Sequence, residues 1–298
     1  MREPRPKSIH LIYLTAAQSR APLGNWQKTP GAVIRPDLSS ILACPACRGS
    51  LLEKAGALRC ERCSQDFPIA NGIPIFLSEP VEIVPINHES NPLGPEFEAI
   101  LEQGAGLTLH LGAGASARRH PNCIEFEHKI FRHTDVVGDA RTLPFLDQIF
   151  DRVFAFNVFE HLRDPVQAAR DIHRVLKPGG EVVIHTAFLQ PLHEAPHHYY
   201  NATEFGVREW FRDFAIERCE VSGNFSPGFM LGFLAATLLD VLPEGEARHE
   251  VARTTLGQWA EFWRRKADPP PGFGALLTLP ADLQKRVAGG FELRARKT

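Results

Sequence analysis

Four cysteines near the start of the chain have the spacing of a metal site. They form two Cys-x-x-Cys pairs, Cys44 with Cys47 and Cys60 with Cys63, with twelve residues between the pairs. Two such pairs can place four thiolates in a tetrahedron around one Zn²⁺ ion, which leaves no position for a catalytic water. We therefore predict a structural zinc site in a small zinc ribbon. The alternatives are two disulfides, which need an oxidising compartment, or a redox-active pair.

A glycine turn indicates a second kind of chemistry. Residues 107–111 (Leu-Thr-Leu-His-Leu) have the composition of a buried strand and run directly into Gly112-Ala113-Gly114. Glycines at this point let the backbone approach a nucleotide closely. Binding of a dinucleotide such as NAD would call for a full helix after the turn and an acid about 20 residues further on.

The segment after the turn is too short for that arrangement. The next expected strand, 123–127, ends in Glu127 and leaves only the eight residues 115–122, including Pro121, for the crossover. A crossover between parallel strands normally takes a dozen residues or more. We expect the first helix to be reduced to about one turn, which argues against a dinucleotide because its pyrophosphate would lose the helix end.

Strands and helices alternate from about residue 105 to residue 222, which is typical of an α/β fold with a mostly parallel sheet. The later expected strands are 134–138, 151–156, 181–186 and 215–222. A helix over 165–176 has apolar residues on one face and is ended by Lys177-Pro-Gly-Gly180. Further helices are expected over 203–214, 228–242 and 248–266.

This pattern predicts five consecutive parts. They are a flexible arm (1–38), the zinc ribbon (39–80), a linker (81–98), the cofactor-binding α/β domain (99–225) and a helical C-terminal extension (226–298). We expect the ribbon and the α/β domain to have separate cores. The helical extension could be a lid, a dimer surface or a cover for the core, and we favour the last.

Composition narrows the functional classes. The chain has 298 residues, of which 44% are apolar and 23% are charged, and its formal net charge is −2. This balance gives no general attraction to nucleic acid or to a membrane surface. No apolar run reaches the roughly 18 residues of a spanning helix, and the N-terminus shows no convincing signal-peptide cleavage site. We expect a cytoplasmic protein.

The order of several motifs resembles a known family. The motifs are Gly112-Ala-Gly114, the acid that ends the second strand, and the segments 138–145 (GDARTLPF), 150–157 (FDRVFAFN), 160–165 (EHLRDP) and 176–184 (LKPGGEVVI). They occur in this order in class I S-adenosylmethionine-dependent methyltransferases, and they are most similar to the methyltransferase-11-like group. The ribbon resembles the small tRNA-methyltransferase activator proteins and the ribbons that precede some bacterial methyltransferase domains.

The resemblance implies S-adenosylmethionine as the cofactor and assigns roles around it. The turn at Gly112, Ala113 and Gly114 would lie beside the methionine part. Glu127 would accept from both ribose hydroxyls, with Glu125 as the second choice. The remaining contacts would come from Asp139 to the adenine amino group, from the backbone of Ala140, and from Asn157 at the end of the fourth strand. At one position the chain departs from the family, which usually has an acid where His110 stands.

Methyl transfer needs a general base only when the acceptor must lose a proton, as a hydroxyl does. The candidates are His161, after the fourth strand, and His198, after the fifth. Both lie beyond strand carboxyl ends, where α/β sheets hold their ligands. His198 belongs to a cluster with His193, Glu194, His197, Tyr199 and Tyr200. A metal site there is disfavoured because His197 and His198 are adjacent and would point apart on an extended chain.

We predict a methyltransferase that acts on an oxygen of a sugar or small metabolite. Segment 196–203 (PHHYYNAT) supports a glycan acceptor, because it resembles a segment in methyltransferases encoded among polysaccharide genes. The alternatives are an RNA methyltransferase whose ribbon contacts RNA, and a non-catalytic scaffold that binds the cofactor. RNA is not favoured because the ribbon mixes both signs of charge and lacks a row of aromatic residues. The oligomeric state and the methyl acceptor stay open.

Overall fold

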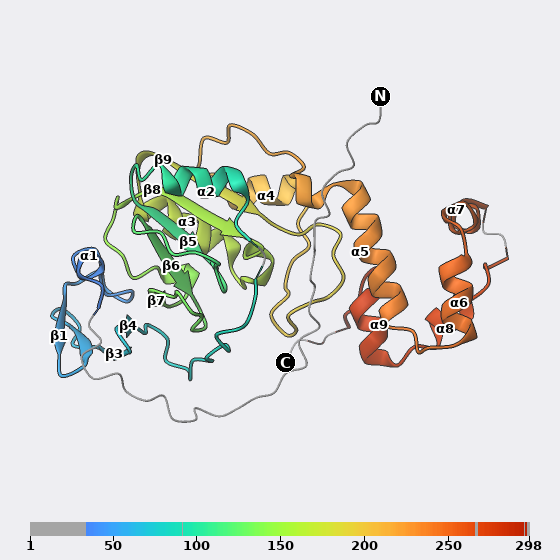
Figure 1. Cartoon of the computed structure of the whole chain (residues 1–298), viewed down its shortest axis with the longest axis horizontal. Helices are drawn as coiled ribbons and strands as arrows, with labels where there is room; N and C mark the ends of the chain where they lie inside the picture. The colour runs from blue at the N-terminus through green and yellow to red at the C-terminus, as the bar shows by residue number, and fades with distance from the viewer. Residues whose placement is uncertain (1–33, 91, 266–267, 295, 297–298) are drawn as a thin grey trace. The chain divides into compact units, whose positions relative to one another are not determined.

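The computed structural model describes residues 34–90, 92–265, 268–294 and 296 (Figure 1). The described residues form two compact units. The first unit contains the residues up to Phe156 together with Val166–Ile184, and the second contains Asn157–Pro165 and the residues from His185 onward.

The ribbon is a four-stranded antiparallel sheet in the order β1-β2-β3-β4. Its strands are β1 (Leu51–Lys54), β2 (Ala57–Cys60), β3 (Asp66–Ala70) and β4 (Ile73–Pro74), preceded by the short helix α1 (Pro36–Ser39). Asn71 and Gly72 join β3 to β4 with positive φ at both positions, 51° and 79°. This is the geometry of a two-residue hairpin turn that Asn-Gly favours.

The second sheet of the first unit carries the glycine turn. It contains β5 (Thr108–Leu111), β6 (Cys123–Glu127), β7 (Val136–Val137), β8 (Phe150–Phe156) and β9 (Leu176–His185), in the order β7-β6-β5-β8-β9. Strand β5 pairs in parallel with β6 and β8, and β6 pairs in parallel with β7. Every residue of β5, β6 and β7 is buried. The expected parallel α/β sheet is therefore present.

Two helices and a short crossover complete this sheet. Helix α2 (Pro95–Glu102) packs Phe97 and Leu101 against Phe154 of β8, and helix α3 (Pro165–Val175) leads into β9. Between β5 and β6 the described chain contains no helix, as the short crossover predicts. Two 3-10 turns, η1 (Ala140–Thr142) and η2 (Phe159–His161), follow β7 and β8.

The ribbon is joined to the larger sheet, so the expectation of separate cores is wrong. The chain after β4 pairs with the edge strand β7, where Phe76 N–H donates to the carbonyl of Val137 at 2.8 Å. Leu42 forms a bridge with Phe145, and Ala43 N–H donates to the carbonyl of Pro144 at 2.9 Å. An exposed edge strand favours such pairing because its backbone groups otherwise lack partners.

The segments before and after the ribbon also pack on the first unit. Residues 1–33 of the expected arm, 1–38, lie outside the described residues. In the described remainder of the arm, Leu38 is buried. Arg35 donates to the carbonyl of Cys123 at 2.9 Å and pairs with the buried Asp135. Within the expected linker, Val84 N–H donates to the carbonyl of Ile130 at 2.9 Å. Helix α2 begins inside this linker, at Pro95, three residues before the linker's expected end at residue 98.

The second unit is helical after α4 (Glu204–Trp210). It contains η3 (Gly223–Phe225), α5 (Pro227–Asp240), α6 (Glu246–Arg253), α7 (Leu256–Arg265), α8 (Phe273–Leu277) and α9 (Ala281–Val287). The strand expected over 215–222 is wrong, because those described residues form no strand. The extension has its own core around Val241, Leu242, Val251 and Leu279. None of the described helices is long and apolar enough to cross a membrane.

The single helix expected over 248–266 is two helices, α6 and α7. Thr255 explains the break, because it starts α7 with a reciprocal cap. Its Oγ1 accepts from the N–H of Gln258 at 3.2 Å, and the Gln258 side chain accepts from the N–H of Thr255 at 2.8 Å. This is a capping box, which fixes the first turn of a helix.

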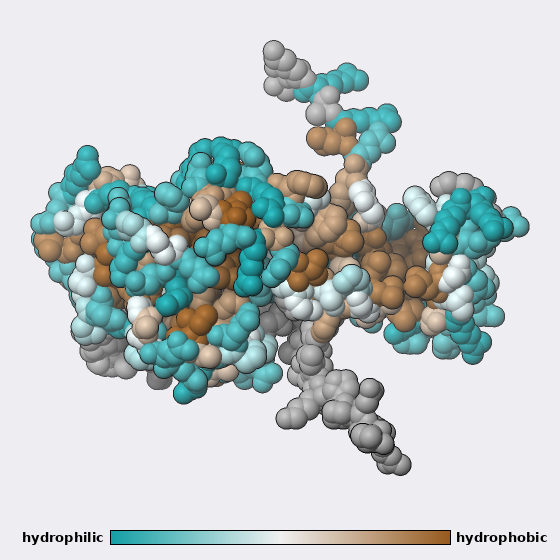
Figure 2. Space-filling model, turned by 90° about the horizontal axis from the view of Figure 1, so that it is seen from above, coloured by the Kyte–Doolittle hydropathy of each residue, from teal (hydrophilic) through white to brown (hydrophobic). Residues whose placement is uncertain are grey.

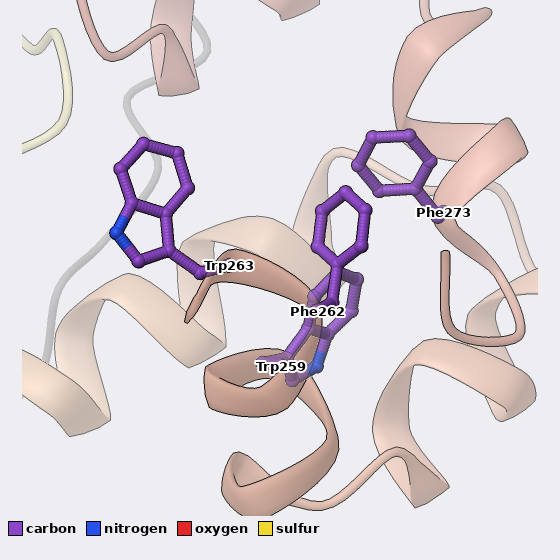
Figure 3. A pocket seen from close by; sticks show the side chains of 4 residues that line it. All are labelled: Trp259, Phe262, Trp263 and Phe273. Atoms are coloured by element: carbon purple, nitrogen blue, oxygen red, sulfur yellow. The ribbon is translucent and has the colours of Figure 1, made fainter. Parts of the chain in front are cut away.

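Apolar surface gathers on the helical extension (Figure 2). Part of it is a pocket of about 500 Å³ lined by Trp259, Phe262, Trp263 and Phe273. In Figure 3, Trp259 and Phe262 lie beside Phe273, whereas the ring of Trp263 points away from them. The rings of Phe262 and Phe273 are 4.9 Å apart between centroids.

Candidate functional site

The four ribbon cysteines converge as their spacing predicts. Their sulfurs lie within 4.8 Å of one another, with Cys44 Sγ 3.6 Å from Cys63 Sγ and Cys47 Sγ 3.4 Å from Cys60 Sγ. Disulfide sulfurs would be about 2.0 Å apart, whereas four thiolates on one Zn²⁺ ion with bonds of about 2.3 Å lie about 3.8 Å apart. The donor set therefore fits a four-thiolate zinc site.

Gly49 allows the first knuckle to close on these sulfurs. A Cβ atom at this position would lie 2.6 Å from the Cβ of Arg62 and 3.0 Å from Cys60 Sγ. The N–H of Cys63 points back to Cys60 Sγ at 3.4 Å. The backbone therefore packs closely around the sulfurs, as expected of a structural metal site.

The glycine turn and the acid at the end of β6 are held together. Gly112 and Gly114 have positive φ angles of 69° and 62°, a conformation that side chains disfavour. The N–H of Gly114 donates to Oε1 of Glu127. The structure thus brings Gly112, Ala113, Gly114 and Glu127 into one site at the carboxyl ends of β5 and β6, where parallel sheets bind ligands.

Glu127 is 4% exposed, and burial raises the pKa of its carboxyl group to about 7. The N–H groups of Gly114 and His128 oppose this shift, while the neighbouring Glu125 adds to it. Burial likewise raises the pKa of Glu125 to about 7. Glu125 Oε1 accepts from Ser116 Oγ at 2.6 Å, so Glu127 is the acid that contacts the turn.

Asp139 and Ala140 lie after β7 in the same unit. Asp139 caps η1 by accepting from the N–H of Arg141 at 2.9 Å, and it also pairs with the Arg141 guanidinium. Burial acts to raise the pKa of Asp139, but the Arg141 guanidinium lowers it by more. The pKa is therefore below its usual value, and the carboxyl group is ionised. Ala140 is buried in the same turn. The adenine contact of Asp139 stays a proposal.

Two further sequence candidates lie at the ends of β5 and β8. His110 is buried, and burial lowers its pKa to about 4, so its ring is neutral. A neutral ring cannot replace the acid that the family usually has at this position. Asn157 directly follows β8 with a positive φ of 56°, and its N–H donates to the carbonyl of His185 at 2.8 Å. Asn157 belongs to the second unit.

The candidate bases form a histidine cluster in the second unit. The ring of His193 lies 5.0 Å from that of His161 and 4.2 Å from that of His198, between centroids. The backbone holds the two segments together, because the N–H groups of Tyr199 and Tyr200 donate to the carbonyl of Glu160 at 2.8 and 3.2 Å.

The two candidate bases differ in their free nitrogens. Burial, together with the neighbouring His193 and His198, lowers the pKa of His161 to about 4. His161 Nδ1 lies 2.8 Å from the carbonyl of His197, so Nδ1 donates and Nε2 keeps a lone pair. Both nitrogens of His198 face backbone groups, the N–H of His193 at 3.3 Å and the carbonyl of Tyr200 at 3.2 Å.

Sequence reasoning missed two residues near these sites. Ser90, from the expected linker, accepts from the N–H of Ala115 at 2.9 Å and covers Gly114. No local pattern indicates this contact. Glu160 is fully buried, and burial raises its pKa to about 7. The sequence could have indicated Glu160 as a site residue, because it stands beside His161 in the segment that resembles the methyltransferases.

Comparison with known proteins agrees with this geometry. Residues 112–184 match a family described as methyltransferase domain, and residues 35–72 match a family described as Trm112p-like protein. Residues 112–184 therefore form a methyltransferase domain. The chain carries a Trm112p-like ribbon on the N-terminal side of that domain.

Individual relatives match shorter segments. Malonyl-[acyl-carrier protein] O-methyltransferase of Marinomonas sp. is 25% identical over 52% of this chain and 56% of that protein. A tRNA U34 carboxymethyltransferase of Campylobacter curvus is 29% identical over 25% of this chain and 30% of that protein. A UPF0434 protein of Legionella pneumophila is 35% identical over 17% of this chain and 88% of that protein. The chain spans 17–30% of the length of the first curated relatives.

The residues present fit the family's cofactor. A turn with two positive-φ glycines leaves backbone groups free to approach a ligand, and a buried carboxylate lies directly beside it. A ribose with two adjacent hydroxyls requires such an acceptor with two oxygens. Glu127 and the turn would hold S-adenosylmethionine, and the four cysteines would hold zinc.

Proposed function

We propose that the protein transfers a methyl group from S-adenosylmethionine to an oxygen of a sugar or small metabolite. The observation that carries this proposal is the hydrogen bond between Gly114 and Glu127, which joins the glycine turn to the acid at the end of β6. The match to an O-methyltransferase supports oxygen as the accepting atom. Segment 196–203 supports a glycan or related acceptor.

The chain's own residues would orient the cofactor. The carboxylate of Glu127 accepts from the ribose hydroxyls, and the backbone at Gly112–Gly114 lies along the methionine part. Asp139 and Ala140 contribute further contacts within the first unit. When bound, S-adenosylmethionine supplies an activated methyl group, which passes to a nucleophilic oxygen as its carbon–sulfur bond breaks.

A hydroxyl acceptor must lose its proton during this transfer. Between His161 and His198, the geometry favours His161, because its Nε2 keeps a lone pair while both nitrogens of His198 face backbone groups. His161 would accept the acceptor's proton and release it to solvent. His198 can take this role only after giving up its hydrogen bond from His193.

A test of this proposal follows the methyl group. The purified full chain is incubated with S-adenosylmethionine labelled in the methyl group and with mono- and oligosaccharides, small hydroxyl metabolites and transcribed RNA. We expect label in a hydroxyl compound, and Glu127→Ala should remove it. Label only in RNA would favour the second candidate, and cofactor binding without transfer to any class would favour a scaffold.

An RNA methyltransferase is the second candidate. Two comparisons favour it: the match to a tRNA U34 carboxymethyltransferase and the match of the ribbon to Trm112p-like proteins. The ribbon's charge does not favour RNA, because Arg59 is paired with Asp66 at 2.9 Å. Arg48 is likewise paired, with Asp171 at 2.9 Å.

A further inference from the structure

Three side chains in the second unit are arranged as ligands of a metal ion. The proposed methyl transfer does not require such an ion. They are Glu160, His161 and His193. One carboxylate oxygen and one nitrogen of each imidazole all lie within 4.8 Å of one another. Glu160 and His161 are adjacent, but they lie in the 3-10 turn η2, whose tight winding does not point neighbouring side chains to opposite sides.

The hydrogen bonds around the histidines leave one nitrogen of each free for a metal. His161 Nδ1 lies 2.8 Å from the carbonyl of His197, and His193 Nδ1 lies 3.0 Å from the carbonyl of Pro191. A carbonyl only accepts, so each Nδ1 carries the proton and each Nε2 keeps a lone pair. Metal-binding histidines are typically oriented by this kind of contact to a carbonyl.

Glu160 supplies an independent observation. Its side chain is 0% exposed, and its Oε2 accepts from Thr186 Oγ1 at 3.0 Å. Within the part of the chain that the structure describes, its Oε1 is buried and has no hydrogen-bond partner. An unpaired buried carboxylate oxygen is strongly unfavourable unless a ligand satisfies it.

We propose that Glu160, His161 and His193 bind one divalent first-row transition metal ion. Two imidazoles and one carboxylate suit Zn²⁺, Mn²⁺ or Fe²⁺ rather than Mg²⁺ or Ca²⁺, which prefer oxygen ligands alone. Metal bonds of about 2.0–2.2 Å would require the side chains to rotate and bring these atoms closer together. Three protein ligands leave open positions on the ion. With the ion bound, His161 is a ligand and no longer a free base, so the ion would bind the acceptor's hydroxyl oxygen and ease the loss of its proton instead. This further role rests on the proposed function, whereas metal binding does not.

The test counts metal ions on the full chain. Wild-type protein is saturated with Zn²⁺ or Co²⁺, freed of excess metal and analysed by elemental analysis. We expect two ions per chain, one in the ribbon and one in the second unit. Glu160→Gln and His193→Ala should each retain only the ribbon ion. Cobalt separates the sites, because only the thiolate site gives an intense sulfur-to-metal charge-transfer band.

Matched variants separate metal binding from a folding defect. His197→Ala keeps the backbone carbonyl that orients His161 and should retain both ions. Thr186→Val removes only the hydrogen bond to Glu160 and should weaken the second site about 10–100-fold, the usual range for an outer partner of a ligand. Thr186→Ser should restore it.

Two results would overturn the inference. One is a single metal ion per wild-type chain at saturating metal. The other is a second ion that both Glu160→Gln and His193→Ala retain. A second ion that binds as described, in a protein without methyl transfer, would contradict the proposed function and leave the metal site standing.

Discussion

Cofactor affinity should depend on pH through Glu127. In the free protein, burial raises the pKa of this carboxyl group to about 7, whereas the ribose hydroxyls need its ionised form as acceptor. Hydroxyl donors stabilise the carboxylate, so cofactor binding lowers this pKa. The affinity must therefore rise with pH and level off above the pKa of the free protein.

The size of the effect follows from that pKa. With a pKa of about 7, about a tenth of Glu127 is ionised at pH 6 and about nine-tenths at pH 8. The affinity for S-adenosylhomocysteine, the product form of the cofactor, should rise about tenfold over this range, or about 1.4 kcal/mol. At pH 7 the complex should release about half a proton, which calorimetry in buffers of different ionisation enthalpy measures.

Two variants isolate the responsible group. Glu127→Gln keeps the shape but cannot ionise, so its affinity should be lower and should lack this component of the pH dependence. The ligand's own amino group also titrates, and the ratio of wild-type to variant affinity removes its contribution. Glu125→Gln should keep the rise in affinity but shift it toward lower pH, because Glu125 adds to the raised pKa of Glu127. A full tenfold rise in Glu127→Gln, or its loss in Glu125→Gln alone, would show that Glu127 is not the titrating group.

Three further outcomes are expected. Removal of zinc by a chelator, or Cys60→Ser, should lower the unfolding temperature of the whole first unit, because the ribbon is paired with β7. Two well-separated unfolding transitions, the upper one at an unchanged temperature, would contradict this. Asp171→Ala should destabilise the protein by about 3–5 kcal/mol in urea unfolding, since Asp171 is buried between Arg48 and Arg174. Arg48→Ala should have a smaller effect, because this side chain is 34% exposed and Arg174 remains. His161→Ala should reduce turnover on a hydroxyl acceptor about 10²–10⁴-fold with unchanged cofactor affinity, and equal loss in His197→Ala would argue for a folding defect.

Local chemistry made much of this fold and site predictable. Four cysteines in two close pairs have few arrangements in space, and Gly112 and Gly114 stand where a strand must turn. The distance from this turn to Glu127 also predicted a crossover without a full helix. Each of these inferences depends on residues close together in sequence.

Contacts between distant residues were not predictable in the same way. The pairing of Leu42 with Phe145 and of Phe76 with Val137 depends on which edge of the sheet is left open. Glu160 becomes a candidate ligand only because the fold brings His193 close to it. The break between α6 and α7 is different, because the Thr255–Gln258 capping box is a local signal that could have been read from the sequence.

The most direct test of the central claim is a crystal structure of the full chain with S-adenosylhomocysteine. We expect the nucleoside at the carboxyl ends of β5 and β6, with both ribose hydroxyls donating to Glu127 and the adenine amino group near Asp139. A ligand bound elsewhere would contradict it. So would a protein that takes up NAD at the glycine turn in preference to S-adenosylhomocysteine.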